Sequence, residues 1–154
     1  MAYSPSIPSS LVPYINRQTG LSVKVSALST YYNIGASITI PKTGIMKMSV
    51  IGHSNSSSSK ALMAFNLTRG GNTYQSNANY SATVSEFSSI LNGYFNNTIP
   101  QILQHSYNQG TAVSGLNDIL EYPVFANDVI QMIIADTGID TSTLYIDDLL
   151  VIVQ

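Results

Sequence analysis

The stretch "ASITIPKTGIMKMSVIG", residues Ala36 to Gly52, decides the predicted fold, because two strand patterns lie on either side of a turn signal. Apolar and polar residues alternate before Pro41 and again from Met46, as they do in half-buried strands. Pro41 suits the first central position of a turn, and Gly44 can adopt a positive φ. The stretch therefore predicts a framework hairpin of a β-sheet protein.

Further strand patterns follow along the chain, separated by turn residues such as Arg69–Asn72 and Asn127–Asp128. The last pattern, residues 142–153, carries apolar residues on both faces, which predicts a central strand that is covered on both sides. Residues 73–110 give a weaker signal: strands are possible at residues 73–75 and 80–84, and a short helix at residues 85–91 or 100–105. The later part could equally be a long surface loop, a class of segment that often carries function. About eight or nine strands with little helix predict an all-β sandwich or barrel.

The chain of 154 residues has the size of one domain. Because three prolines lie among serines near its start, we expect residues 1–20 to form an extended N-terminal arm and residues 21–154 to form the β domain. The first residues lack a basic segment followed by an apolar one, so we expect no signal peptide. No stretch reaches the roughly 18 apolar residues of a membrane span.

Charged residues make up only 9% of the chain, although 44% is hydrophobic. An average soluble domain has roughly 25% charged residues. The net charge of −2 does not favour nucleic-acid binding, which needs clustered Lys and Arg. The chain has no cysteine, which excludes disulfides and thiolate chemistry. Such a neutral polar surface suits an acidic setting, because it contains few ion pairs that acid would break.

The charges are divided along the chain. All six basic residues lie between Arg17 and Arg69, and all eight acidic residues lie between Glu86 and Asp148. In one interpretation, a β-sandwich interleaves the two halves in space and mixes the signs. In the other, a basic patch on one subunit meets an acidic patch on its neighbour in a homo-oligomer.

The segment "SITIPKTGIMKMSVIG" resembles the strand–Pro-x-x-Gly–strand segment of jelly-roll domains of the tumour-necrosis-factor and complement-C1q type. "ALMAFNLTRGGN" is similar to the strand that follows in that family. In "YPVFANDVIQMII", Asn127-Asp128 stands where the family usually has Gly-Asp, and "TLYIDDLLVIV" is similar to its closing strand. Ile45 and Met46 depart from the usual aromatic residues, and residues 73–110 match nothing. The resemblance implies a single-domain antiparallel β-sandwich with jelly-roll topology.

Jelly-roll domains of this type occur as trimeric ligands, sugar-binding modules and virus capsid, spike or tail components. The Cys-free composition, rich in Ser, Asn, Thr and Tyr, resembles virion surface proteins, including those of archaeal viruses from hot acidic springs. We therefore expect a structural protein of a virus particle surface, such as a turret, spike, penton or tail component, that is assembled in the host cytoplasm. The alternative is an extracellular C1q/TNF-like carbohydrate- or protein-binding module.

The expected partners are copies of the same chain, as a trimer or pentamer, and other virion proteins. A host surface glycan or receptor is a further expected partner, and nucleic acid is not. The sequence has two histidines, His53 and His105, and lacks the Gly-x-Ser-x-Gly pattern of a nucleophile elbow. We therefore expect no catalytic residues, no enzymatic activity and no cofactor.

Two aspartates, Asp136 and Asp140, lie in the loop-like "ADTGIDTS" and are candidate calcium ligands. The simpler interpretation is that they cap the loop. Two Asn-x-Ser sequons in expected loops make Asn55 and Asn79 the glycosylation candidates. The expected contact loops are residues 52–60 and 73–110, with six candidate contact residues: His53, Asn55, Tyr74, Tyr80, Tyr94 and Phe95.

Overall fold

The computed structural model describes residues 11–56, 58–76, 79–81, 86–91, 95–96, 122–139 and 141–154. Within these ranges the chain is almost entirely extended. The strands are β1 (Tyr14–Lys24), β2 (Tyr32–Asn33), β3 (Ile38–Thr39), β4 (Gly44–Ser54), β5 (Ala61–Arg69), β6 (Asn72–Ser76), β7 (Asn79–Ser81), β8 (Glu86–Leu91), β9 (Phe95–Asn96), β10 (Tyr122–Val124), β11 (Val129–Asp136) and β12 (Thr143–Val153). In this part of the chain, no helix is long and apolar enough to cross a membrane.

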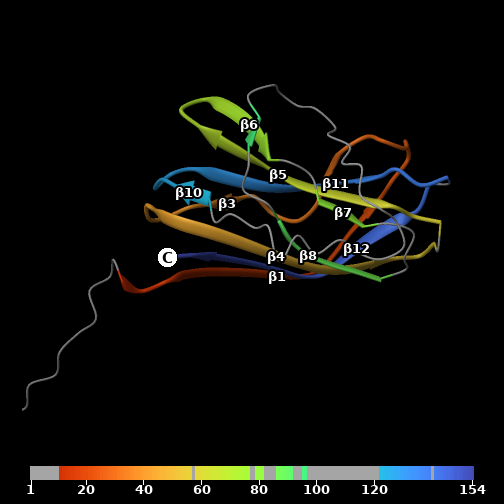
Figure 1. The fold of residues 1–154 in the computed structure, drawn as a ribbon, viewed down its shortest axis with the longest axis horizontal. Coiled ribbons are helices and arrows are strands. Elements are labelled where there is room, and N and C mark those ends of the chain that lie inside the picture. The colour runs from red at the N-terminus through yellow and green to blue at the C-terminus, as the bar shows by residue number, and fades with distance from the viewer. Residues whose placement is uncertain are drawn as a thin grey trace, which may run out of the picture.

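The strands form two antiparallel sheets that pack face to face (Figure 1). Sheet A has the order β1-β12-β4, and both β8 and β10 pair with the free side of β4. In sheet B, β2 and β3 pair with one side of β11, β5 pairs with its other side, and β6 and β7 pair with β5. The first and last strands are neighbours, and both sheets combine early and late strands. This is the strand order of a jelly roll, so the predicted all-β sandwich is confirmed.

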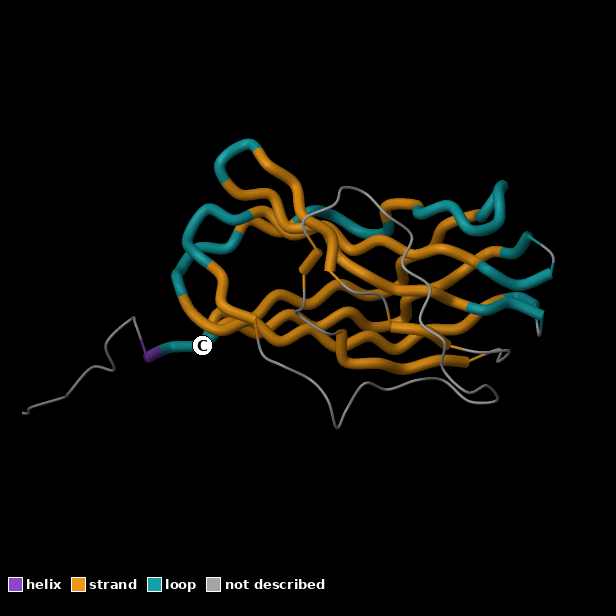
Figure 2. The backbone as a smooth tube through the Cα atoms, turned by 45° about the horizontal axis from the view of Figure 1, so that its top comes forward, coloured by secondary structure: helices purple, strands orange, loops and turns teal. Residues whose placement is uncertain are grey.

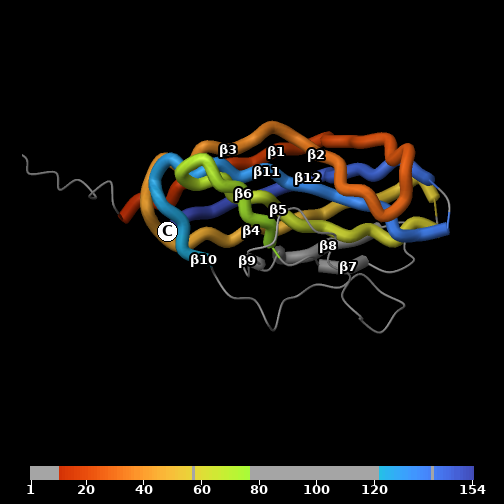
Figure 3. Tube along the Cα trace, turned by 90° about the horizontal axis from the view of Figure 1, so that it is seen from above, coloured from red at the N-terminus to blue at the C-terminus, as the bar shows by residue number. Residues whose placement is uncertain are grey.

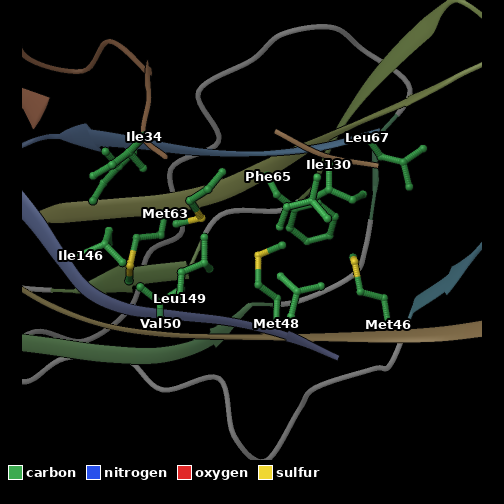
Figure 4. Close-up of a cluster of buried hydrophobic side chains, with 14 of the residues drawn as sticks. Ile34, Met46, Met48, Val50, Met63, Phe65, Leu67, Ile130, Ile146 and Leu149 are labelled. Atoms are coloured by element: carbon green, nitrogen blue, oxygen red, sulfur yellow. The ribbon is translucent and has the colours of Figure 1, made fainter. Parts of the chain in front are cut away.

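The core lies between the sheets and is built by alternating side chains. Met46, Met48 and Val50 of β4 point toward Met63 and Phe65 of β5 (Figure 4). All five are nearly inaccessible to solvent, and burial of a side chain of this size stabilises a fold by about 1.5–3 kcal/mol. The strand periodicity around Pro41 therefore identified core positions correctly.

Two strands of sheet B, β5 and β11, are buried on both faces. Leu62, Ala64, Ile133 and Ala135 form a second apolar cluster there, against which Tyr31 packs. The sequence predicted double burial for residues 142–153 instead. In β12 only the inward side chains are buried, and the outward ones stay half-exposed or exposed. That prediction is wrong for the outer face, because an apolar pattern does not show whether anything covers it.

The stretch from Ala36 to Gly52 is not a hairpin, which corrects the prediction made from its turn signal. β3 pairs with β11 in sheet B, whereas β4 belongs to sheet A. Residues 40–43 therefore carry the chain from one sheet to the other. Asn127 and Asp128 act in the same way, since β10 pairs with β4 in sheet A and β11 lies in sheet B. Both turn signals mark corners of the sandwich.

Gly44 is needed for close packing and not for a positive φ. A Cβ at this position would collide with the backbone carbonyl of Gln154 and press on Val153. The backbones approach closely here because Ile45 and Gln154 exchange two hydrogen bonds, of 2.6 and 2.9 Å. The lack of a side chain at Gly44 thus allows the end of β4 to pack closely against the end of β12.

β1 begins at Tyr14, so the expected arm of residues 1–20 is wrong for residues 14–20. These residues pair with β12, beginning at Tyr14 opposite Val153. Polar side chains interrupt the apolar alternation in this segment, so the sequence pattern did not indicate a strand. Gln18 faces inward, accepts a hydrogen bond from the Ala36 amide (2.8 Å) and donates one to the Ala36 carbonyl (2.9 Å). Residues 1–10 lie outside the described residues.

Replacing Gly44 with Ala should destabilise the domain, because the β4–β12 contact must open to admit the Cβ. We expect the free energy of unfolding, measured by urea denaturation, to fall by about 1–3 kcal/mol.

Gly70 is the matched control, since its φ is +57° and the space around it is open. Asn adopts this left-handed backbone readily, so Gly70→Asn should change stability little. Gly44→Asn should destabilise at least as much as Gly44→Ala. Equal effects of Asn at the two glycines would contradict the steric explanation.

Candidate functional site

The loops gather at the two ends of the sandwich (Figure 2). Residues 25–31, 55–56, 58–60, 137–139 and 141–142 meet at one end, which we call the serine end. Residues 40–43, 70–71 and 125–128 lie at the other, where the chain also reaches Gln154 (Figure 3). Each end is held by a buried aspartate.

Asp136 organises the serine end. Its carboxylate is fully buried at the end of β11 and accepts four hydrogen bonds. The backbone amides of Lys60 and Gly138 donate to Oδ1 (3.0 and 2.8 Å), and the hydroxyls of Ser59 and Ser142 donate to Oδ2 (3.0 and 2.6 Å). One carboxylate therefore joins the loop before β5 to the loop before β12.

The calcium hypothesis for Asp136 and Asp140 stays a prediction, because Asp140 lies outside the described residues. Both oxygens of Asp136 accept protein hydrogen bonds, which is the loop-capping role that the sequence offered as the simpler interpretation. Among the residues that the structure describes, no group of three or more His, Cys, Asp or Glu side chains is placed to hold a metal ion.

Asp128 organises the opposite corner. Its side chain is 2% exposed and receives two hydrogen bonds from Arg69, of 2.9 and 2.6 Å, and one from the Phe125 amide, of 2.7 Å. The Arg69 guanidinium also lies 4.3 Å from the centre of the Phe125 ring. Asn127 has a φ of +75°, which explains how Asn can stand where the resembling family usually has Gly.

The pKa of Asp128 reflects two opposing effects. Burial raises it, but the hydrogen bonds from Arg69 and the Phe125 amide, with the charge of Arg69, outweigh burial and hold it below the ordinary value of 3.8. A lowered folded-state pKa stabilises the fold at pH values above the unfolded pKa. This contribution is lost as the pH falls through the folded pKa.

His53 lies in β4, which extends to Ser54, so its expected place in a contact loop is wrong. Its Nδ1 is 2.8 Å from a carboxylate oxygen of Asp147, and its ring stacks on Tyr145 with centroids 4.5 Å apart. Asp147 is the extra residue of a β-bulge between Ile146 and Asp148. The bulge lets Asp147 share the outer face of sheet A with His53 and Tyr145.

The other predicted contact residues differ in position: some lie in a loop, some lie in strands, and some fall outside the described residues. Asn55 lies in a loop as predicted, is exposed, and accepts a hydrogen bond from the Thr143 amide at 2.9 Å. Tyr74 lies in β6, which agrees with the strand that the sequence allowed at residues 73–75, and it is half-buried against the core and not in a contact loop. Asn79 and Tyr80 lie in β7 and Phe95 lies in β9, in positions known for the backbone only. Tyr94 and His105 fall outside the described residues.

The divided charges meet within the chain. Arg17 binds Asp148 through two hydrogen bonds, of 2.8 and 2.9 Å, and Arg69 binds Asp128. Each pair joins the basic first half to the acidic second half, which supports the interleaving interpretation.

The outer face of sheet A carries exposed apolar side chains. Ile15 is 58% exposed, Ile45 is 40% exposed and Ile51 is 54% exposed. Ile45 and Ile51 alternate with core residues of β4, and Ile15 alternates with half-buried residues of β1. Leu150 and Ile152 of β12 lie between them and are half-buried. A shallow cavity of about 230 Å³ is lined by Ile45, Lys47, Ile152 and Gln154. The apolar residues on both faces of residues 142–153 were the sequence signal for this outward apolar surface.

Comparisons of the chain with protein-family models, curated proteins and solved structures found no match. The resemblance to jelly-roll domains of the TNF and C1q type therefore stays an expectation from motifs.

Replacing Asp136 with Asn should weaken the serine end, because a neutral amide accepts fewer and weaker hydrogen bonds than a carboxylate. We expect the free energy of unfolding to fall by about 1.5–3 kcal/mol. Asp147→Asn, at an exposed position, should have a far smaller effect. Calcium or EDTA should leave the melting temperature unchanged; a rise with calcium that Asp136→Asn abolishes would support the calcium hypothesis.

Replacing Arg69 with Met leaves the Asp128 carboxylate buried without its cation. We expect a loss of about 2–4 kcal/mol at neutral pH, somewhat below the value for fully buried pairs because Arg69 is 35% exposed. The difference in stability between wild type and variant should shrink as the pH falls toward and through the folded-state pKa of Asp128, which the wild type holds below its ordinary value. Arg17→Met, at the exposed pair, is the control and should do little. A difference that is constant from pH 7 to pH 2 would contradict the ion-pair explanation.

Proposed function

We propose that this chain is a self-assembling structural component of a virus particle surface. The observation that carries the proposal is the jelly-roll strand order, an architecture that capsid proteins share with lectins and other domains. Its place on the virion surface, its assembly in the host cytoplasm and its origin in an archaeal virus rest on the resemblance in composition alone.

The distribution of apolar side chains supports self-assembly. The core is filled by inward side chains from both sheets, yet Ile15, Ile45 and Ile51 remain exposed on one outer face. Exposed apolar patches of this kind mark interaction sites in soluble proteins. The outer face of sheet A is thus the assembly surface in this proposal.

The two ends of the sandwich are suited to display. Asp136 ties the loops of the serine end together, and Asp128 ties the opposite corner, so both ends are braced by buried carboxylates. Braced loops lose little conformational entropy when they bind a partner. The serine end, with exposed Asn55, is the proposed outward-facing end.

A second candidate is a C1q/TNF-like carbohydrate- or protein-binding module. The cluster of His53, Tyr145 and Asp147 favours it, because an aromatic ring beside a carboxylate on a partly exposed surface suits recognition of polar ligands.

Antibodies raised against the folded domain should label the surface of intact particles purified from cells that produce this chain, as seen by electron microscopy. Denatured particles serve as the control for epitopes hidden by assembly. Particles that contain none of the chain would overturn the proposal. If the isolated domain then bound a glycan array, and Tyr145→Ala abolished that binding, the second candidate would replace it.

A further inference from the structure

The outer face of sheet A is large enough to be an interface. β1, β12 and β4 are neighbouring strands of 11 residues each. Strands rise about 3.3 Å per residue and lie about 4.8 Å apart, so these three cover about 36 Å by about 14 Å, or about 500 Å². Two such faces bury about 1,000 Å², the lower limit for a specific protein interface.

Four side chains form an apolar band across this face. In the sheet register, Ile15 lies opposite Ile152, and Ile152 lies opposite Lys47. Leu150 is the next outward residue of β12 and lies opposite Ser49 of β4. Ile51 is the next outward residue of β4 after Ser49. The apolar band therefore runs from the Gln154 end to the middle of the strands.

Lys47 and Asp147 lie on either side of the middle of the face. Lys47 is exposed beside the apolar band toward the Gln154 end. Asp147 is exposed at the bulge toward the other end, where Lys24 of β1 is a second exposed cation. Arg17 and Asp148 neutralise each other between the two ends. Lys47 and Asp147 can therefore pair when the face meets its own reversed copy.

We propose that the outer face of sheet A binds the same face of a second copy of this chain about a two-fold axis. The axis lies in the face and crosses the strands near Ser49 and Leu150. Leu150 then meets its own copy, Ile152 lies level with the partner's Ile51, and Lys47 lies level with the partner's Asp147. Two sheets pack in this way about 10 Å apart, with their strands nearly aligned.

This inference rests on the self-assembly in the proposed function and makes it specific. A two-fold contact pairs copies, unlike the trimer or pentamer expected from the sequence. A self-complementary face also explains why β12 carries apolar residues on both sides although only its inner side is buried in the single chain.

Light scattering of the purified chain, coupled to gel filtration over a range of concentrations, tests the contact. We expect a mass twice the 16.6 kDa of one chain. Ile51→Lys should raise the dissociation constant on the order of tenfold or more, because it places a charge in the apolar band and over the partner's Lys47. Ile139→Lys is the matched control, since Ile139 is 78% exposed on a loop of the serine end, and it should leave the mass unchanged.

Charge reversal tests the orientation of the two copies. Lys47→Asp and Asp147→Lys should each weaken association by roughly threefold to tenfold, because each places like charges together. The double variant restores opposite charges and should recover most of the affinity. Circular dichroism confirms that each variant is folded before its mass is compared.

Each contrary result has a distinct meaning. A wild-type chain that stays monomeric at the highest concentrations overturns both this inference and the self-assembly in the proposed function. An oligomer that Ile51→Lys leaves intact overturns the face and leaves the proposed function standing. A mass of three or five chains, or a double variant no better than the single ones, overturns the two-fold geometry.

Discussion

The placement of β12 between β1 and β4 is the constraint on which the sandwich depends. β12 exchanges backbone hydrogen bonds with both neighbours along almost its full length, so sheet A has no centre without it. Its inward side chains also complete the core beneath sheet B. Gly44 and the Ile45–Gln154 hydrogen bonds fix the end of this strand, and the bulge at Asp147 adjusts its register. The pairing register of β12 with β1 and β4 determines which residues lie side by side on the outer face of sheet A.

The sequence predicted the strands better than it predicted their partners. Alternation identified the strands on either side of Pro41, because burial on one face leaves a period of two. It did not reveal that β3 and β4 belong to different sheets, since a corner between sheets uses the same Pro and Gly as a hairpin. The polar start of β1 was missed for a related reason. Inward-facing Gln18 satisfies its amide group with the backbone of Ala36, so a polar residue occupies an inward position.

The candidate sites depend on contacts between residues far apart in the chain, which no local pattern contains. Asp136 was recognised as a loop aspartate, but its partner Ser59 lies 77 residues away. His53 was recognised as one of two histidines, but Asp147 lies 94 residues away and reaches it through a bulge. The topology brings such pairs together, because each sheet places early strands beside late ones. The same topology mixes the basic and acidic halves and makes the sparse charges pair within the chain.

The adjacency of the first and last strands also has a consequence for synthesis. β1 and β4 leave the ribosome long before β12, and during that time the edges that β12 will occupy have no partner. Ribosomes add about 5–20 residues per second, so the wait lasts for seconds. Domains rich in such distant pairings also fold slowly, in milliseconds to seconds. The nascent chain must therefore keep the open edges of β1 and β4 from pairing with other chains until translation of β12 is complete.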